Sequence, residues 1–212
     1  METWAIIPIK HLKEAKSSLS SVMNPLQRQE FVLRMLTDIL RAVEISDSVA
    51  GSIVVSPDSR VLEFSQPFGA TIIRDPGKGL NHALDLAVKK VKEIGGKAAL
   101  IMPGDVPLVT PREIDEVVGL ASREHEVIIA KSNRKGTNAM LLKPPDAIKL
   151  KFGGESFPLH VEEASLAGIN PRVYESLRLA TDIDEVSDLA KVKKLGGGTK
   201  SWEFIKSLDN SQ

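Results

Sequence analysis

Lysines and aspartates recur directly after short apolar segments of this chain. Lys10, Lys13 and Lys16 follow the segment 5–9, and Asp105 follows the segment 98–102. A pair of carboxylates lies near the C-terminus, at Asp182 and Asp184, and a polar turn with the sequence RDPGKG follows the segment 70–73. Cationic and anionic side chains that converge on one edge suit a polyphosphate with a divalent metal, because Mg²⁺ takes one or two carboxylates plus phosphate oxygens.

An alternation of strands and helices would position these side chains. We expect strands at residues 5–9, 52–56, 70–73, 98–102, 127–130, 139–142 and 172–174. Helices are expected from Pro25, from about Asp58, at 80–94, from Pro111, at 156–167, from Asp184 to Leu195, and around Trp202. This order predicts an α/β, three-layer, Rossmann-like and mostly parallel sheet with helices on both faces. Ligands of such sheets bind beyond the carboxyl ends of the strands.

Composition limits the possible classes of protein. The length of 212 residues predicts a single domain over residues 1–212. Lys plus Arg and Asp plus Glu number 28 each, so no overall positive field attracts nucleic acid. The absence of cysteine excludes thiolate metal sites and disulfides. No segment approaches the ~20 apolar residues of a membrane span. We therefore expect a cytoplasmic protein that binds neither nucleic acid nor membrane, and a homodimer on general grounds.

Asp105 is the best single candidate for a metal ligand. It lies in MPGDVPLV, where an apolar strand delivers one carboxylate. A turn aspartate is the alternative, but Thr110 with Glu113 already forms the capping box of the next helix. Asp182 and Asp184 would share one face if extended, and the alternative for Asp184 is a helix cap.

The loop at residues 10–21 contains no glycine, so it cannot be a Walker A loop. Its lysines could neutralise phosphates as point charges, and the alternative is a solvated basic loop. Two glycine turns, at residues 136–138 and 152–156, are candidate anion sites, because backbone amides at a helix start suit a phosphate or a carboxylate. The four histidines lack metal-ligand spacing, and no GxSxG motif is present.

Six motifs in order resemble one family. PIKHLKEAKSSLS, DPGKGLNHAL, MPGDVPLV, GTNAML, FGGESFPLH and TDIDEVSDL span most of the chain, from about Trp4 to about Leu195. Together they are similar to the 2-phospho-L-lactate guanylyltransferases of coenzyme F-420 biosynthesis, within the nucleotidyltransferase and glycosyltransferase-A superfamily. One departure is Ser18, which stands where the narrower family often has arginine.

The resemblance implies transfer of GMP from GTP to phospholactate, or to phosphoenolpyruvate as in bacterial relatives, with release of pyrophosphate. It implies phosphate contacts for Lys10 and Lys16, and base or ribose contacts for Gly79, Leu80 and Asn81. Asp105 would hold Mg²⁺ with help from Asp182 or Asp184. The acid would bind at the two glycine turns, through Thr137, Asn138, Gly153 and Ser156.

Two other hypotheses for the function of this chain stay open at this point. One is a transferase of the same fold that acts on a sugar phosphate, a molybdopterin or a sugar acceptor. A glycosyltransferase would usually show a DxD motif, whereas Asp105 is followed by Val106 and Pro107. The other is a non-catalytic nucleotide-binding module, because a fold alone does not prove activity.

Overall fold

The computed structural model describes residues 2–210. Its single sheet has seven strands: β1 (Thr3–Pro8), β2 (Val49–Ser56), β3 (Thr71–Arg74), β4 (Ala98–Ile101), β5 (Glu126–Lys131), β6 (Thr137–Lys143) and β7 (Arg172–Val173). The helices are α1 (Pro25–Ile45), α2 (Ser59–Ser65), α3 (Leu80–Glu93), α4 (Pro111–Gly119), α5 (Ser156–Leu166), α6 (Val186–Leu195) and α7 (Lys200–Asp209). Short 3₁₀ turns lie at η1 (Leu12–Glu14), η2 (Ser17–Leu19) and η3 (Gln66–Phe68).

The strand order is β3-β2-β1-β4-β6-β5-β7. All neighbouring pairs are parallel except the two that involve β6, which runs antiparallel to β4 and to β5. The predicted mostly parallel sheet is therefore confirmed. The reversal of β6 has a consequence for the site, because it brings the beginning of β6 to the edge where the other strands end.

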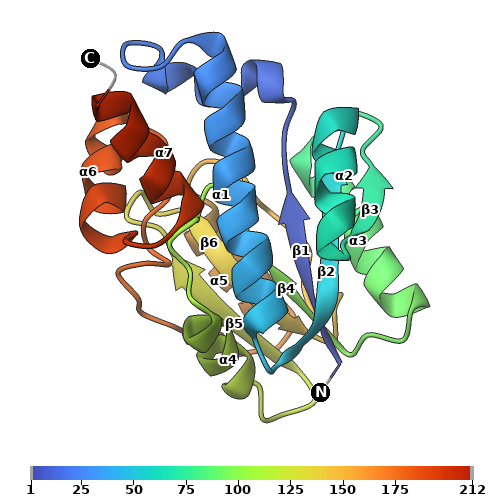
Figure 1. Cartoon of the computed structure of the whole chain (residues 1–212). Helices are drawn as coiled ribbons and strands as arrows, with labels where there is room; N and C mark the ends of the chain where they lie inside the picture. Colours follow the sequence, from blue (N-terminus) through green and yellow to red (C-terminus); the bar gives the residue numbers. More distant parts are fainter. Residues whose placement is uncertain (1, 211–212) are drawn as a thin grey trace.

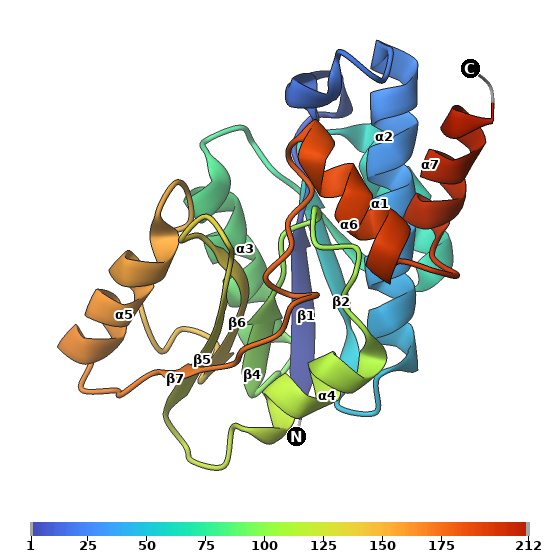
Figure 2. The same ribbon diagram turned by 90° about the vertical axis from the view of Figure 1, so that its left-hand side faces the viewer.

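Helices cover both faces of the sheet, as predicted (Figure 1). The view turned by 90° shows α3 and α5 on one face, with α1, α2, α4, α6 and α7 on the other (Figure 2). Two separate groups of buried apolar side chains correspond to these two faces. Adjacent residues of β1 show the division: Ile7 packs toward α1 and Ile6 toward α3, because side chains alternate along a strand.

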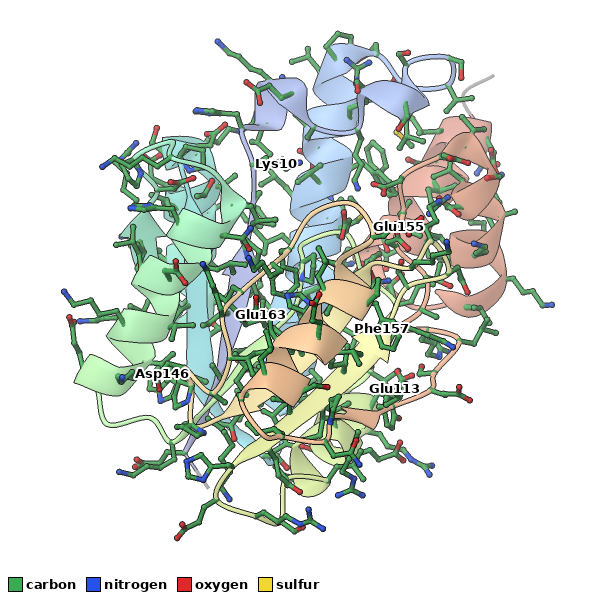
Figure 3. All side chains as sticks on the ribbon, turned by 180° about the vertical axis from the view of Figure 1, so that it is seen from behind. Lys10, Glu113, Asp146, Glu155, Phe157 and Glu163 are labelled. Atoms are coloured by element: carbon green, nitrogen blue, oxygen red, sulfur yellow. The ribbon has the colours of Figure 1, made fainter. Side chains whose placement is uncertain are left out.

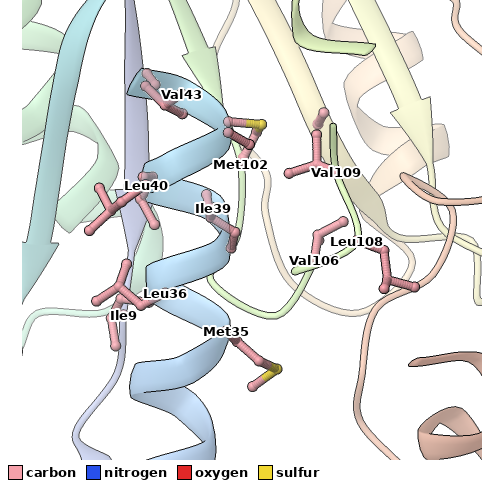
Figure 4. Close-up of a cluster of buried hydrophobic side chains, with 14 of the residues drawn as sticks. Ile9, Met35, Leu36, Ile39, Leu40, Val43, Met102, Val106, Leu108 and Val109 are labelled. Atoms are coloured by element: carbon pink, nitrogen blue, oxygen red, sulfur yellow. The ribbon is translucent and has the colours of Figure 1, made fainter. Parts of the chain in front are cut away.

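The larger core anchors the segment that carries Asp105. Figure 4 shows side chains of α1, including Met35, Leu36 and Ile39, in the same buried cluster as Met102 and the run from Val106 to Val109. Val106 and Leu108 are almost fully buried. Burial of a Val or Leu side chain contributes about 1.5–3 kcal/mol, so the loop after β4 is held firmly on both sides of its carboxylate.

The structure confirms the predicted starts of two helices, at Pro25 and Pro111, and corrects the start of a third. Asn24 and Thr110 each form a capping box, with proline at the first helical position. The helix expected to begin at Asp184 begins two residues later, at Val186, with Glu185 as its cap and Asp188 as the reciprocal partner. Asp184 is not a cap, and its carboxylate is free for another partner. None of the helices within residues 2–210 combines the length and apolar character needed to cross a membrane.

Candidate functional site

A cleft of about 970 Å³ opens at the carboxyl edge of the sheet, a volume typical of small-molecule sites. It is lined by every predicted site residue except Asn81: Lys10, Lys16, Gly79, Leu80, Asp105, Thr137, Asn138, Gly153, Ser156, Asp182 and Asp184. These residues come from the two glycine turns, the loop at residues 10–21 (the lysine loop), the segments that follow β3 and β4, and the segment before α6. The tertiary structure thus assembles the six motifs into one site.

The ammonium group of Lys16 links two carboxylates from distant parts of the chain. Lys16 Nζ lies 3.2 Å from Asp105 Oδ2 and 2.8 Å from Asp184 Oδ1. Burial of the ammonium would lower the pKa of Lys16, but the charges of Asp105 and Asp184 outweigh burial and raise this pKa. The pKa of Asp184 is lowered, because Lys16 more than offsets the effect of burial. Lys16 and Asp184 are therefore both charged near neutral pH.

Backbone geometry supports this arrangement. Lys16 has left-handed backbone angles, φ 53° and ψ 42°, a region that costs a non-glycine residue about 1–2 kcal/mol. Ser18, two residues after Lys16, donates a hydrogen bond from Oγ to the carbonyl of Asp184. Ile183 N donates to Asp105 O at 2.9 Å. These contacts hold three segments together around the ammonium group of Lys16, and Ser18 has a structural role in this junction.

Lys10 differs from Lys16 in its surroundings. Its side chain is exposed, and no hydrogen bond or ion pair engages it in the part of the chain that the structure describes. Figure 3 shows Lys10 beside the end of β1 and Glu155 at the start of α5, both toward the upper end of the molecule, with Asp146 far below. Lys10 therefore offers the cleft an uncommitted positive charge, whereas Lys16 offers one that is already shared.

Asp182 is committed to partners within the protein. Its Oδ1 accepts from Asn138 Nδ2 at 3.3 Å, and its Oδ2 lies 3.2 Å from Arg134 Nη1. Burial, together with the negative charges of Asp105 and Asp184, raises the pKa of Asp182 despite the Asn138 hydrogen bond. The Asn138 amide also donates to Leu179 O at 2.9 Å. Asn138 thus positions Asp182, although the resemblance had implied that it would bind the acid.

Arg134 and Asp188 form an ion pair that was not anticipated from the sequence. Arg134 Nη2 lies 2.8 Å from Asp188 Oδ2, and the same oxygen accepts from the backbone amides of Asp184 and Glu185. Asp188 is buried. Burial would raise its pKa, but the Glu185 amide, Arg134 and Lys191 outweigh burial and lower the pKa to about 2. The sequence signal that could have indicated a role for Arg134 at the site is its position just beyond the strand expected at 127–130.

The opposite side of the cleft is lined by hydroxyls and glycines. Thr137 opens the reversed strand β6, and its Oγ1 lies 2.8 Å from Nδ1 of the buried His160. Ser156 is the first residue of α5, and its hydroxyl has no hydrogen-bond partner within residues 2–210. The preceding Gly153 has φ 122° and Gly154 has φ 49°, values that favour glycine. Hydroxyls beside a helix start are suited to an anion.

Asn81 is the one predicted site residue that the cleft does not include. Its side chain forms two hydrogen bonds with the backbone of Phe152, donating to O at 3.0 Å and accepting from N at 2.8 Å. Gly79 and Leu80, by contrast, line the cleft at the start of α3, where no side chain caps the helix. Asn81 therefore fastens the 152–156 turn to α3, and the base or ribose contact implied for it has no support in this geometry.

The donor set is compatible with Mg²⁺ shared with a ligand. Carboxylate oxygens are the donors that Mg²⁺ prefers, and it usually keeps one or two of them plus phosphate oxygens. Within residues 2–210, no group of three or more acidic or histidine side chains is arranged to hold a metal unaided. Asp105 and Asp184, each partly exposed to the cleft, fit the two-carboxylate case. Asp182 fits less well because both of its oxygens are already engaged.

Solved structures share this fold. A nucleotidyl transferase from Methanothermobacter thermautotrophicus superimposes with a TM-score of 0.71, covering 97% of this chain and 99% of that one, at 16% identity. A cytidylyltransferase from Leptospira borgpetersenii gives a TM-score of 0.65, covering 100% and 95%, at 14% identity. The chain therefore has the fold of the nucleotidyltransferases.

Sequence relatives narrow this class. Residues 3–211 match the family model described as guanylyl transferase CofC like. A phosphoenolpyruvate guanylyltransferase from Rubrobacter xylanophilus is 36% identical, over 93% of this chain and 96% of its own length. A 2-phospho-L-lactate guanylyltransferase from Methanocaldococcus jannaschii is 33% identical, over 96% and 88%. The chain belongs to the CofC-like guanylyl transferase family, and the predicted nucleotidyltransferase is confirmed.

The Asp188 carboxylate should stabilise the fold in a pH-dependent way. Because its pKa falls from an ordinary 3.8 to about 2, its contribution is present above about pH 4 and is lost as the pH falls toward 2. The shift corresponds to about 2 kcal/mol. We expect Asp188→Asn to lower the free energy of unfolding by about this amount near neutral pH, and the gap to wild type to narrow below about pH 4.

Urea denaturation across this pH range measures the effect. Asp146→Asn is the matched control, because Asp146 pairs with Lys92 at the surface, and such a change usually stays within about 0.5 kcal/mol. A gap that is constant with pH would contradict a role for the Asp188 charge.

Proposed function

We propose that this protein transfers GMP from GTP to a small phosphorylated carboxylic acid, 2-phospho-L-lactate or phosphoenolpyruvate, with release of pyrophosphate, as a step of coenzyme F-420 biosynthesis. The observation that carries the proposal is the shared cleft. Lysines and carboxylates suited to a triphosphate line it together with a separate, glycine-flanked hydroxyl site suited to a small anion. Relatives named for these two activities match this chain over most of its length.

The nucleotide side of the proposal rests on the lysine loop and the start of α3. Lys10 supplies a free ammonium that can meet a phosphate as a point charge. Lys16 keeps its charge through Asp105 and Asp184, so it can add a phosphate oxygen to its shell without a change of protonation. Gly79 and Leu80 leave the start of α3 accessible, where open backbone amides favour an anionic group.

The acid side rests on Thr137, Gly153 and Ser156. Ser156 is a buried residue that lines the cleft, and its hydroxyl has no hydrogen-bond partner within residues 2–210, so it is available to a ligand. Thr137 lies on the neighbouring strand and lines the same cleft. Two hydroxyls and a glycine turn can accommodate the carboxylate or phosphate of a small acid without adding a positive charge.

Mg²⁺ is part of the proposal, with Asp105 and Asp184 as the residues that would hold it. When bound, it would supply charge neutralisation of the phosphate oxygens. The ammonium group of Lys16 contacts the same two carboxylates, so a Mg²⁺ ion bound between them would compete with this ammonium group or displace it. Asp182 remains with Arg134 and Asn138, and we assign it the positioning of its neighbours on the 182–184 segment.

The reaction needs little acid–base chemistry. A phosphate monoester is mostly dianionic at neutral pH, since its second pKa is about 6. One of its oxygens can form the new bond to the α-phosphorus while the bond to the β-phosphate bridging oxygen breaks and pyrophosphate leaves with the electron pair. The residues then have to bring two anions together and hold them in line, which lysines and oriented hydroxyls can do. The reaction therefore requires neither a catalytic histidine nor a serine elbow.

A screen for pyrophosphate release tests the proposal. We expect release from GTP with phospholactate or phosphoenolpyruvate, and much less with ATP, CTP or UTP or with a sugar phosphate as acceptor. GTP binding without turnover for every acceptor would point to a nucleotide-binding module, and turnover with a sugar phosphate would point to the rival transferase. The homodimer and the cytoplasmic location stay predictions.

Loss of the Asp105 charge should slow the reaction without unfolding the protein. Asp105→Asn keeps the shape but removes one of the two carboxylates beside Lys16, and a loss of about 3 kcal/mol of transition-state stabilisation corresponds to a rate lower by about 10². The concentration of Mg²⁺ for half-maximal turnover should rise. Turnover against Mg²⁺ and the melting temperature are measured together, with Asp146→Asn as control. Normal turnover in a folded Asp105→Asn protein would contradict the role of Asp105 as a ligand of Mg²⁺.

The unpartnered Ser156 hydroxyl should bind the acid and not the nucleotide. Ser156→Ala removes one hydrogen bond, so we expect the KM for the acid to rise roughly 3- to 10-fold, with the KM for GTP nearly unchanged. Ser165→Ala is the matched control, because Ser165 lies on the same helix and its Oγ bonds only to Val161 O. Equal rises in both KM values would assign Ser156 to the fold of the whole cleft.

A further inference from the structure

His160 lies on α5, four residues after Ser156, and its side chain is fully buried. Both ring nitrogens have partners. Nε2 lies 3.0 Å from the backbone N of Lys151, and Nδ1 lies 2.8 Å from Oγ1 of Thr137. The ring also packs edge-on against Phe152, with ring centroids 4.7 Å apart. It therefore touches both the turn and the strand that form the acid side of the cleft.

The Lys151 contact determines which nitrogen of His160 carries the proton. A backbone amide can only donate, so Nε2 must accept and must lack a proton. Burial lowers the pKa of His160 to about 4, so the ring is neutral near neutral pH. A neutral imidazole carries one proton, which must then be on Nδ1. His160 Nδ1–H consequently donates to Thr137 Oγ1.

This donation has a consequence for Thr137. Its hydroxyl oxygen already accepts a hydrogen bond from His160, and its own proton has no acceptor within residues 2–210. Thr137 lines the cleft, and buried donors are usually satisfied. A ligand oxygen that carries lone pairs and negative charge can accept this proton, whereas a ligand group that can only donate cannot.

We propose that His160 is a positioning residue that holds the Thr137 hydroxyl as a hydrogen-bond donor to an anionic oxygen of the acid substrate. The inference rests on the proposed function for the identity of the ligand. His160 itself does not touch the substrate in this assignment. It acts through Thr137 on one side and, through Lys151 and Phe152, on the turn that carries Gly153 and Ser156.

The tautomer can be measured on the ligand-free protein, independently of activity. Nitrogen-15 NMR distinguishes a protonated ring nitrogen from an unprotonated one, and we expect His160 to be neutral near neutral pH with its proton on Nδ1. A proton on Nε2 would overturn the inference, because Thr137 would then have to donate to the ring and could not donate to a ligand.

Two substitutions separate the contacts of the ring. The amide of glutamine reaches about as far as Nε2, so His160→Gln can still accept from Lys151 but loses the donor to Thr137. The amide of asparagine reaches about as far as Nδ1, so His160→Asn keeps that donor and loses the acceptor for Lys151. We expect His160→Gln to raise the KM for the acid about tenfold, with little change for GTP, and His160→Asn to raise it less.

A structural role alone would give a different pattern. The KM effects would then follow the melting temperatures, and His160→Asn, which frees the Lys151 amide, would be at least as impaired as His160→Gln. That pattern would contradict the inference. A double-mutant cycle adds a second criterion: in a Thr137→Val background, His160→Gln should have almost no further effect on the acid KM, whereas additive effects would contradict action through Thr137.

Failure of this inference is distinct from failure of the proposed function. Wild-type protein that transfers GMP to neither acid would contradict the function. Normal transfer with equal kinetics in both His160 variants would leave the function intact and overturn the positioning role.

Discussion

The buried ammonium of Lys16 between Asp105 and Asp184 is the interaction on which the site depends. It joins the lysine loop to the end of β4 and to the segment before α6. In the sequence, Asp105 is 89 residues from Lys16 and Asp184 is 168 residues from it. Backbone bonds support the same junction, through Ser18 to Asp184 and Ile183 to Asp105. Because Lys16 contacts two carboxylates, it keeps one partner when either carboxylate is neutralised, whereas loss of both would leave a buried charge unpaired and strongly destabilise the fold. The junction also places a positive charge beside the two carboxylates that we propose for Mg²⁺.

The distribution of charge, and not its sum, gives the cleft its chemical character. The whole chain has equal numbers of acidic and basic residues. In the cleft, Asp105, Asp182 and Asp184 gather on one side, and each has a cationic partner in Lys16 or Arg134. Asp188 anchors Arg134 beneath them. Two anionic substrates can approach such a site because its positive groups are held in place and Lys10 remains uncommitted.

The reversed strand β6 explains how the hydroxyl-lined side, which we propose binds the acid, shares the cleft with the lysines. A parallel strand in that place would begin at the opposite edge of the sheet, away from the lysines. Because β6 is antiparallel to both neighbours, Thr137 and Asn138 at its start reach the edge where β1 and β4 end. The turn at residues 152–156 closes over this start, tied to α3 by Asn81 and to β6 through His160. The acid side thus has a rigid frame of its own.

Local patterns in the sequence were sufficient for the order of strands and helices, the helix start at Pro25, and the capping box at Thr110. These depend on apolar periodicity and on short-range capping, which act within a few residues of the chain. The roles of Asn81, Asn138, Asp184 and His160 depend on partners 9 to 168 residues away. No local pattern encodes which distant group a polar side chain meets. The packing of α5 and the direction of β6 bring the His160 ring against the Thr137 hydroxyl. Burial keeps this imidazole neutral, and the Lys151 amide donates to Nε2, so the single ring proton is on Nδ1 and the Thr137 hydroxyl accepts it.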